Sequence, residues 1–228
     1  MKDKNFSADI LSNIDRESVE ERLMQTLDIL NIEEQSIDID EDCALEIKEY
    51  LALLDLIMEI DEESLPAVNS SNKKTTITQP GMRYSQATEL VNSILQDEKF
   101  SNFSVTERAY ILDRILSEVK GRMLEEIVLL ETKIANPQKQ VFKLQFSTGE
   151  FDMVVADKKT LTCEIYEIKY SKEIVEKQYQ HLTDVKKCED TAFRFGEIKG
   201  RYVIYRGETT EVDGIKYVNA EEYLKSLA

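Results

Sequence analysis

Glycine is scarce in this chain of 228 residues: only seven are present, and none occurs before Gly81. Loops that cradle a nucleotide phosphate need several glycines, because their backbone takes up positive φ angles and comes close to the ligand. Neither GxGxxG nor GxxxxGK followed by Ser or Thr can be written anywhere in the sequence. Nucleotide binding by these two devices is therefore excluded, and any ATP hydrolysis connected with the protein would belong to a partner.

Cysteine and histidine are also rare, with three cysteines and a single histidine. Cys43, Cys163 and Cys188 are too few and too scattered for a disulfide framework, and together with His181 they do not form a structural zinc site. No run of about 18 apolar residues occurs, and the first ten residues lack the apolar segment of a secretion signal. These absences predict a cytoplasmic protein with no membrane span.

Acidic residues outnumber basic ones, 45 to 29, so the formal net charge is −16. Residues 1–137 carry 14 bases and 29 acids, whereas residues 138–228 carry 15 bases and 16 acids. The same boundary separates a front half with helical apolar periodicity from a back half with alternating, strand-like segments. The acidic front half suits a basic protein surface as partner, while the back half is electrostatically free to approach a phosphate backbone.

The front half predicts helices with one β-hairpin between them. Leu23, Leu27 and Leu30 recur at helical spacing after an acidic start that suits a helix N-terminus. The elements expected next are a helix over 44–56, a strand over 57–60, a loop over 69–74, a strand over 75–78, a turn over 79–81 and a helix over 85–95. This is the order of a small winged-helix unit, so we expect a helical segment over 1–42 and a winged-helix domain over 43–100.

The back half predicts a domain of the α/β or α+β class over 101–228. A long helix is expected over 106–135, where Pro137 ends it, and the pattern leaves open whether Gly121 interrupts it. The elements expected next are strands over 141–146, 151–155 and 161–170, a helix over 172–188, strands over 202–205 and 215–218, and a closing helix over 221–227. The predicted order contains an αβββαβ core.

Charged side chains interrupt two of the apolar strands in this core. Alternation places Glu167 and Lys169 on one strand face, roughly 6.5 to 7 Å apart, and Asp152 on an otherwise apolar face of the preceding strand. Burying such charges unpaired would cost several kcal/mol, so they need each other, a metal or a phosphate. Carboxylates, water and substrate phosphate satisfy Mg²⁺, and a lysine can orient or deprotonate the attacking water. A strand-end salt bridge and a hydrolytic site are both compatible with the pattern.

The element order, with Asp152 followed by Glu167-Ile168-Lys169, resembles the core of the PD-(D/E)XK nuclease superfamily, which has the restriction-endonuclease-like fold. Two earlier segments, 121–125 and 78–84, are similar to the C-terminal half of prokaryotic P-loop ATPases of the AAA type. That half carries a winged-helix segment and a nuclease-like C-terminal domain, and the resemblance extends from about residue 7 to the end. The ATPase core of that family is missing here, in agreement with the scarcity of glycine.

The resemblance implies a site and a function. Asp152, Glu167 and Glu125 would be ligands of Mg²⁺ or Mn²⁺, and Lys169 would be the catalytic lysine. The implied activity is metal-dependent DNA phosphodiester hydrolysis by a domain associated with an ATPase. The alternative is a DNA-binding or regulatory module that does not cleave and that partners an AAA-type ATPase.

The acid contributed by the long helix is ambiguous. Resemblance favours Glu125, whereas helical periodicity places Glu126 nearer the apolar face, unless Gly121 resets the helix phase. Elsewhere, His181 is expected at the surface, with Gln178 and Tyr179 facing solvent. The basic residues of the back half form either a phosphate-binding surface or a solvated face of mixed charge. They are Lys158, Lys159, Lys172, Lys177, Lys186, Lys187, Arg201 and Arg206.

Overall fold

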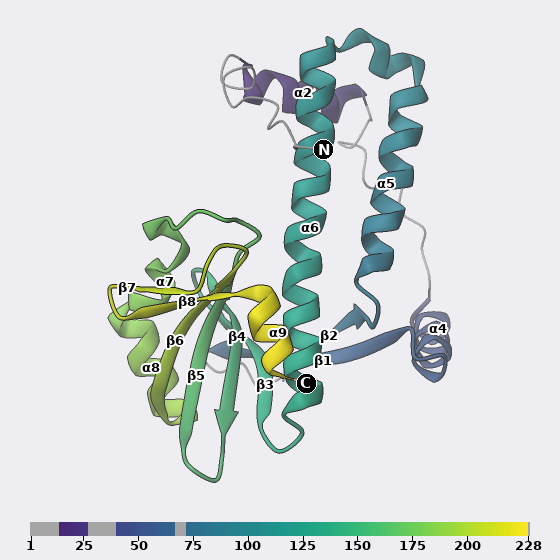
Figure 1. The fold of residues 1–228 in the computed structure, drawn as a ribbon. Helices are drawn as coiled ribbons and strands as arrows, with labels where there is room; N and C mark the ends of the chain where they lie inside the picture. The colour runs from purple at the N-terminus through teal and green to yellow at the C-terminus, as the bar shows by residue number, and fades with distance from the viewer. Residues whose placement is uncertain (1–13, 27–39, 67–71, 228) are drawn as a thin grey trace. The chain divides into compact units, whose positions relative to one another are not determined.

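The computed structural model describes residues 14–26, 40–66 and 72–227, and the chain divides into two compact units (Figure 1). One unit comprises residues 1–47 and 81–120, and the other comprises residues 48–80 and 121–228. No helix within the described ranges is long and apolar enough to cross a membrane.

The first unit is helical. Its described elements are α2 (Arg16–Thr26), the start of α4 (Glu41–Leu53), α5 (Gly81–Gln96), the 3-10 helix η1 (Glu98–Asn102) and the first part of α6 (Val105–Ala135). A small apolar core joins α2, η1 and α6 through buried side chains: Val19, Phe100, Phe103, Tyr110 and Ile111. The leucine repeat predicted at the start of the chain lies only partly in the described residues, because 27–39 are outside them.

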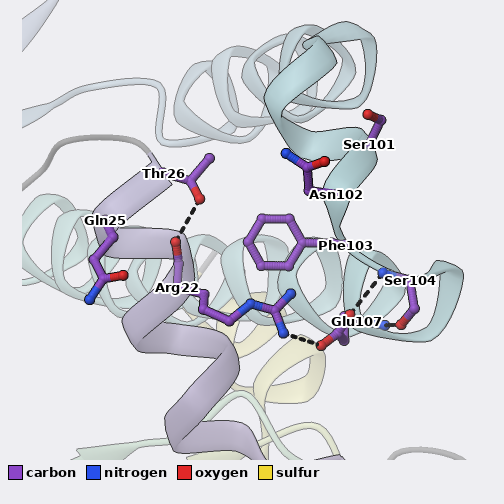
Figure 2. A pocket seen from close by; sticks show the side chains of 8 residues that line it. All are labelled: Arg22, Gln25, Thr26, Ser101, Asn102, Phe103, Ser104 and Glu107. Atoms are coloured by element: carbon purple, nitrogen blue, oxygen red, sulfur yellow. Dashed lines mark hydrogen bonds and ion pairs between the residues drawn. The ribbon is translucent and has the colours of Figure 1, made fainter.

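A capping box fixes the beginning of α6. The Glu107 N–H donates to Ser104 Oγ at 3.2 Å, and the Ser104 N–H donates to Glu107 Oε2 at 2.8 Å. These reciprocal bonds satisfy two of the backbone donors that a helix start leaves open. The other oxygen of Glu107 accepts from Arg22 at 2.9 Å, and the Arg22 guanidinium lies 4.7 Å from the centre of the Phe103 ring (Figure 2). One glutamate thus both caps α6 and connects it to α2.

The second unit is built on a mixed sheet of eight strands in the order β2-β1-β3-β4-β5-β6-β8-β7. The strands are β1 (Ile57–Leu65), β2 (Asn72–Ile77), β3 (Gln140–Phe146), β4 (Glu150–Asp157), β5 (Thr162–Ile168), β6 (Glu197–Tyr205), β7 (Thr210–Val212) and β8 (Ile215–Asn219). β1 runs parallel to β3, β5 to β6, and β6 to β8, whereas the other neighbours are antiparallel. The edges of the sheet are β2 and β7.

Helices cover both faces of this sheet (Figure 1). α7 (Gln180–Thr183) and α8 (Val185–Phe195) pack on one face, where Leu182 and Cys188 join a core with Phe142, Ile165 and Val203. The part of α6 after residue 120 and α9 (Ala220–Ser226) pack on the other face. The core there includes Val128, Leu129, Val155, Ile168 and Ile204. The fold is therefore mixed α/β, as the sequence predicted.

The predicted hairpin does not form a separate winged-helix domain. β1 pairs with β3, from Asp61 opposite Phe142 to Leu65 opposite Phe146, so the hairpin extends the large sheet. The units therefore differ from the domains expected over 1–42, 43–100 and 101–228. The acidic stretch within β1 hides its second half from a search for apolar alternation, so only its first four residues were predicted as strand.

The structure decides one helix that the sequence left open and corrects another. α6 is one continuous helix through Gly121. The helix predicted over 172–188 is instead a 3-10 turn, η2 (Glu176–Gln178), followed by α7 and α8. Asp184 starts α8 anew, because its side chain accepts the Lys187 N–H at 3.1 Å. The short strand β7 was not predicted.

Candidate active site

The site is organised around an irregularity in β4. β3 and β4 change register between Phe142 and Leu144, where Lys143 of β3 faces both Asp152 and Met153 of β4. A β-bulge of this kind places two residues opposite one and changes the direction of a side chain. The bulge therefore frees the Asp152 side chain from the strict alternation of the strand.

Asp152, Glu167 and Lys169 meet in one ion-pair cluster, in which the two carboxylates are buried and Lys169 is half-buried. The Lys169 ammonium lies 2.8 Å from Asp152 Oδ2 and 2.7 Å from Glu167 Oε2. Asp152 Oδ2 also accepts the backbone N–H of Ile168 at 2.7 Å, which ties the bulge of β4 to the end of β5. Asp152 is 4% exposed and Glu167 is 2% exposed. The structure thus brings together the three residues that the sequence singled out on neighbouring strands.

The electrostatics of this cluster follow from burial and proximity. Burial raises the pKa of Glu167 to about 8, the Asp152 charge adds to the rise, and Lys169 opposes it. Burial alone would lower the pKa of Lys169, but the charges of Asp152 and Glu167 outweigh burial and raise it. Lys169 is therefore an ammonium at neutral pH. Glu167 Oε1 is buried and has no hydrogen-bond partner among the described residues.

A second ion pair lies next to the first. Glu125 of α6 accepts a hydrogen bond from the Lys143 ammonium at 3.1 Å, and Lys143 is only 5% exposed. Burial raises the pKa of Glu125, and Asp152 raises it further, whereas Lys143 and Lys169 oppose the rise. The sequence left Glu125 and Glu126 open, and the structure places Glu125 in electrostatic contact with both Asp152 and Lys169.

Sequence reasoning missed Lys143 and misplaced two further basic residues. His181 was expected at the surface, but its Nδ1 lies 2.7 Å from the Lys187 ammonium and its ring is half-buried. Lys187 was expected on a phosphate-binding surface or on a solvated face of mixed charge, but it is only 8% exposed. Gln178 and Tyr179 are half-buried rather than solvent-facing. A lysine inside the apolar strand 141–146 was the one signal for Lys143, whereas no pattern pointed to the His181–Lys187 contact.

The suitability of the cluster for a metal can be judged from its donors. Within the described ranges, no group of three or more His, Cys, Asp or Glu side chains is arranged to hold a metal ion. Instead, each carboxylate of the cluster faces an ammonium group. The donor chemistry nevertheless fits a hard divalent cation, because Glu125, Asp152 and Glu167 supply only carboxylate oxygens. The buried Glu167 Oε1 without a partner also fits, since a bound cation would satisfy it.

Comparisons with protein-family models, with curated proteins and with solved structures find no match for this chain. The fold and the site define a mixed α/β protein with an acid–lysine cluster at a β-bulge.

Proposed function

We propose that this chain is a metal-dependent deoxyribonuclease domain of the PD-(D/E)XK type, which acts beside an AAA-type ATPase. The observation that carries the proposal is the meeting of Asp152, Glu167 and Lys169 in contacts of 2.7 to 2.8 Å. The order α6, β3, β4, β5, α7 with α8, and β6 also agrees with the αβββαβ core that the resemblance implies. Perturbed ionisable groups that cluster in this way are typical of catalytic sites.

The roles of the side chains follow from their positions. Asp152, Glu167 and Glu125 would hold Mg²⁺ or Mn²⁺. Such an ion polarises a phosphoryl oxygen and lowers the pKa of bound water. Lys169, as an ammonium, would orient the attacking water or stabilise the charge that develops on the phosphoryl group, rather than accept a proton. Asp152 and Glu167 would fix the position of that ammonium. The water oxygen would replace the departing ester oxygen on phosphorus, with the proton of the attacking water passing to solvent and the departing oxygen taking up a proton from solvent.

The ion pairs themselves favour a second candidate function. Lys169 bridges two carboxylates and Lys143 occupies a third, so the side chains already neutralise one another in large part. A module that binds DNA or regulates an AAA-type ATPase without cleavage would keep such a cluster as a structural element. The acidic front half also favours a protein partner. Experiments therefore have to distinguish a module that does not cleave DNA from a nuclease.

Removal of the Lys169 ammonium is the direct test of hydrolysis. The purified chain with Mg²⁺ or Mn²⁺ should nick plasmid DNA, and Lys169→Ala should slow nicking by at least about 100-fold, as loss of a group that stabilises developing charge does. The measurement is the rate of conversion of supercoiled to open circular plasmid. Lys158→Ala, which removes an exposed lysine in the β4–β5 turn, should leave that rate unchanged.

Asp152→Asn provides an independent variant, because it keeps the side-chain shape while removing a charge. It should abolish nicking with retention of the far-ultraviolet circular dichroism spectrum. Nicking that survives both substitutions, or no nicking with any divalent metal, would contradict the enzyme. If no divalent metal supports nicking, DNA binding or co-purification with an AAA-type ATPase would favour the module that does not cleave DNA.

A further inference from the structure

Lys187 is a buried lysine whose ammonium group has no acidic partner in the described part of the chain. It takes part in none of the ion pairs formed there. Its contacts are His181 Nδ1 at 2.7 Å and the Phe146 ring, whose centre lies 5.1 Å away. The carboxylate of Asp184 accepts the backbone N–H of Lys187 as the cap of α8. Lysines are almost never buried without a counter-charge, so this ammonium is available to an anion.

The lysine also fixes the state of the histidine. An ammonium group only donates hydrogen bonds, so Nδ1 of His181 must accept, and the neutral ring then carries its hydrogen on Nε2. Burial and the charges of Lys187 and Lys169 lower the pKa of His181, while Asp152 and Asp184 oppose this effect. His181 therefore offers an N–H donor of fixed tautomer next to a positive charge.

The pair lies beside the acid cluster. The turn between β3 and β4 packs on it at Gly149, three residues before Asp152. A Cβ atom at Gly149 would lie 2.8 Å from His181 Cε1 and 3.2 Å from the Lys187 ammonium. Gly149 also has a φ of 79°, so both its conformation and the space around it require glycine. The charges of Asp152 and Lys169 are close enough to shift the pKa of His181.

We propose that His181 and Lys187 form a binding site for a phosphate group of nucleic acid, adjacent to the phosphate held at the acid cluster. The choice of nucleic acid rests on the proposed function. A phosphodiester carries one negative charge and two free oxygens, which match one ammonium and one neutral N–H donor. Contacts of this kind fix the register of a nucleic acid strand without reading its sequence.

Because the chain contains a single histidine, nuclear magnetic resonance of protein labelled with ¹⁵N-histidine reports on this site alone. The free protein should show the Nε2–H tautomer. A short single-stranded oligonucleotide, added in EDTA so that no metal is bound, should shift the Nε2 resonance to saturation. A shift with inorganic phosphate but none with the oligonucleotide would overturn the assignment to nucleic acid. An Nδ1–H tautomer, or no shift with either probe, would overturn the site.

Substitution of Lys187 tests the charge directly, with Lys186 as a matched control. Both lysines lie in the first turn of α8, but Lys186 is exposed. In EDTA, Lys187→Gln should weaken oligonucleotide binding about tenfold, as expected for loss of one charged hydrogen bond. Lys186→Gln should weaken it by less than about twofold, and Lys187→Arg should restore most of the affinity. Equal losses in both glutamine variants would show that only net charge matters and would contradict the site.

The two proposals can fail separately. Binding in EDTA involves no hydrolysis, so loss of nicking in Lys169→Ala says nothing about the anion site. A chain that never cleaves DNA but binds it through Lys187 would refute the deoxyribonuclease and support the phosphate site. A chain that cleaves DNA and binds the oligonucleotide equally well without the Lys187 side chain would support the deoxyribonuclease and refute the phosphate site.

Discussion

At the scale of single residues, the molecule is defined by the charges that it buries. Asp152, Glu167, Lys143 and Lys187 are each at most 8% exposed. Removing such groups from water costs several kcal/mol per ion, and ion pairs offset that cost only when their geometry is good. The second unit concentrates these groups around one bulge rather than dispersing them. A concentration of costly groups at one place is characteristic of a functional site rather than of a stabilising device.

The lowered pKa of His181 makes stability depend on pH in a definite direction. In the unfolded chain the imidazole takes up a proton near its ordinary pKa of 6.5, whereas the folded chain resists protonation. The unfolded state therefore binds more protons below about pH 6.5, and the contribution of His181 to the free energy of unfolding falls as the pH falls. His181→Gln should lack this contribution.

Urea unfolding of the wild type and of His181→Gln between about pH 5 and 8 measures the effect. The difference in free energy of unfolding between the two proteins should change in favour of the variant as the pH decreases. A difference that is flat, or that changes in favour of the wild type, would show that the imidazole is not held neutral.

Residue patterns could predict part of the site because its core lies on adjacent strands. Asp152, Glu167 and Lys169 were recognisable as charges within apolar alternation. Lys143 also interrupts an apolar strand, but its partner Glu125 comes from α6, and His181 packs on the turn at Gly149, so these contacts were not recognisable. Sequence periodicity describes which face of one element a residue occupies, but it does not say which other element covers that face.

At the scale of elements, α6 extends over 31 residues with Gly121 in its interior. Apart from its own helix, no residue in the described ranges comes within 4 Å of a Cβ atom built at Gly121, and its backbone is helical. Glycine lowers helix stability relative to alanine because it has more freedom to lose. Gly121→Ala should therefore raise the free energy of unfolding by about 0.5 to 1 kcal/mol, measured by urea unfolding.

Gly214 provides the matched contrast. Among the described residues, none comes within 4 Å of its Cβ position either, but its φ is 75°, in the left-handed region. Gly214→Ala should lower the free energy of unfolding by about 1 to 2 kcal/mol, because an L-residue is strained there. Equal effects of the two substitutions would contradict an uninterrupted helix at Gly121.

The elements were more predictable than their arrangement. Alternation and helical spacing identified most strands of the second unit, and the capping box at Ser104 and Glu107 agrees with the start predicted for α6. The pairing of β1 with β3 was not predictable, because the whole of α5 and the whole of α6 lie between the two strands in the sequence. Contacts between such distant segments leave no trace in local periodicity.

At the scale of the whole molecule, the net charge of −16 produces repulsion within the folded chain. Salt screens exposed charges beyond a Debye length of about 10 Å at 0.1 M ionic strength. An increase of NaCl from about 20 to about 300 mM should therefore raise the free energy of unfolding by roughly 1 kcal/mol. Urea unfolding at each salt concentration measures the free energy of unfolding. The increase should be the same in NaCl and in KCl, because screening depends on ionic strength. A decrease would show that exposed ion pairs such as Arg22–Glu107 outweigh the repulsion.

The two edge strands of the sheet affect how copies of the protein meet at high concentration. An exposed strand edge is a template onto which another chain can pair, and such pairing is a route to aggregation. β2 presents the exposed lysines Lys73 and Lys74 at one edge, while β7 at the other edge is only three residues long and carries the exposed Glu211. Like charges oppose the pairing of two β2 edges, and a three-residue strand offers few hydrogen bonds. The sheet is thus protected at both ends against growth into a fibril.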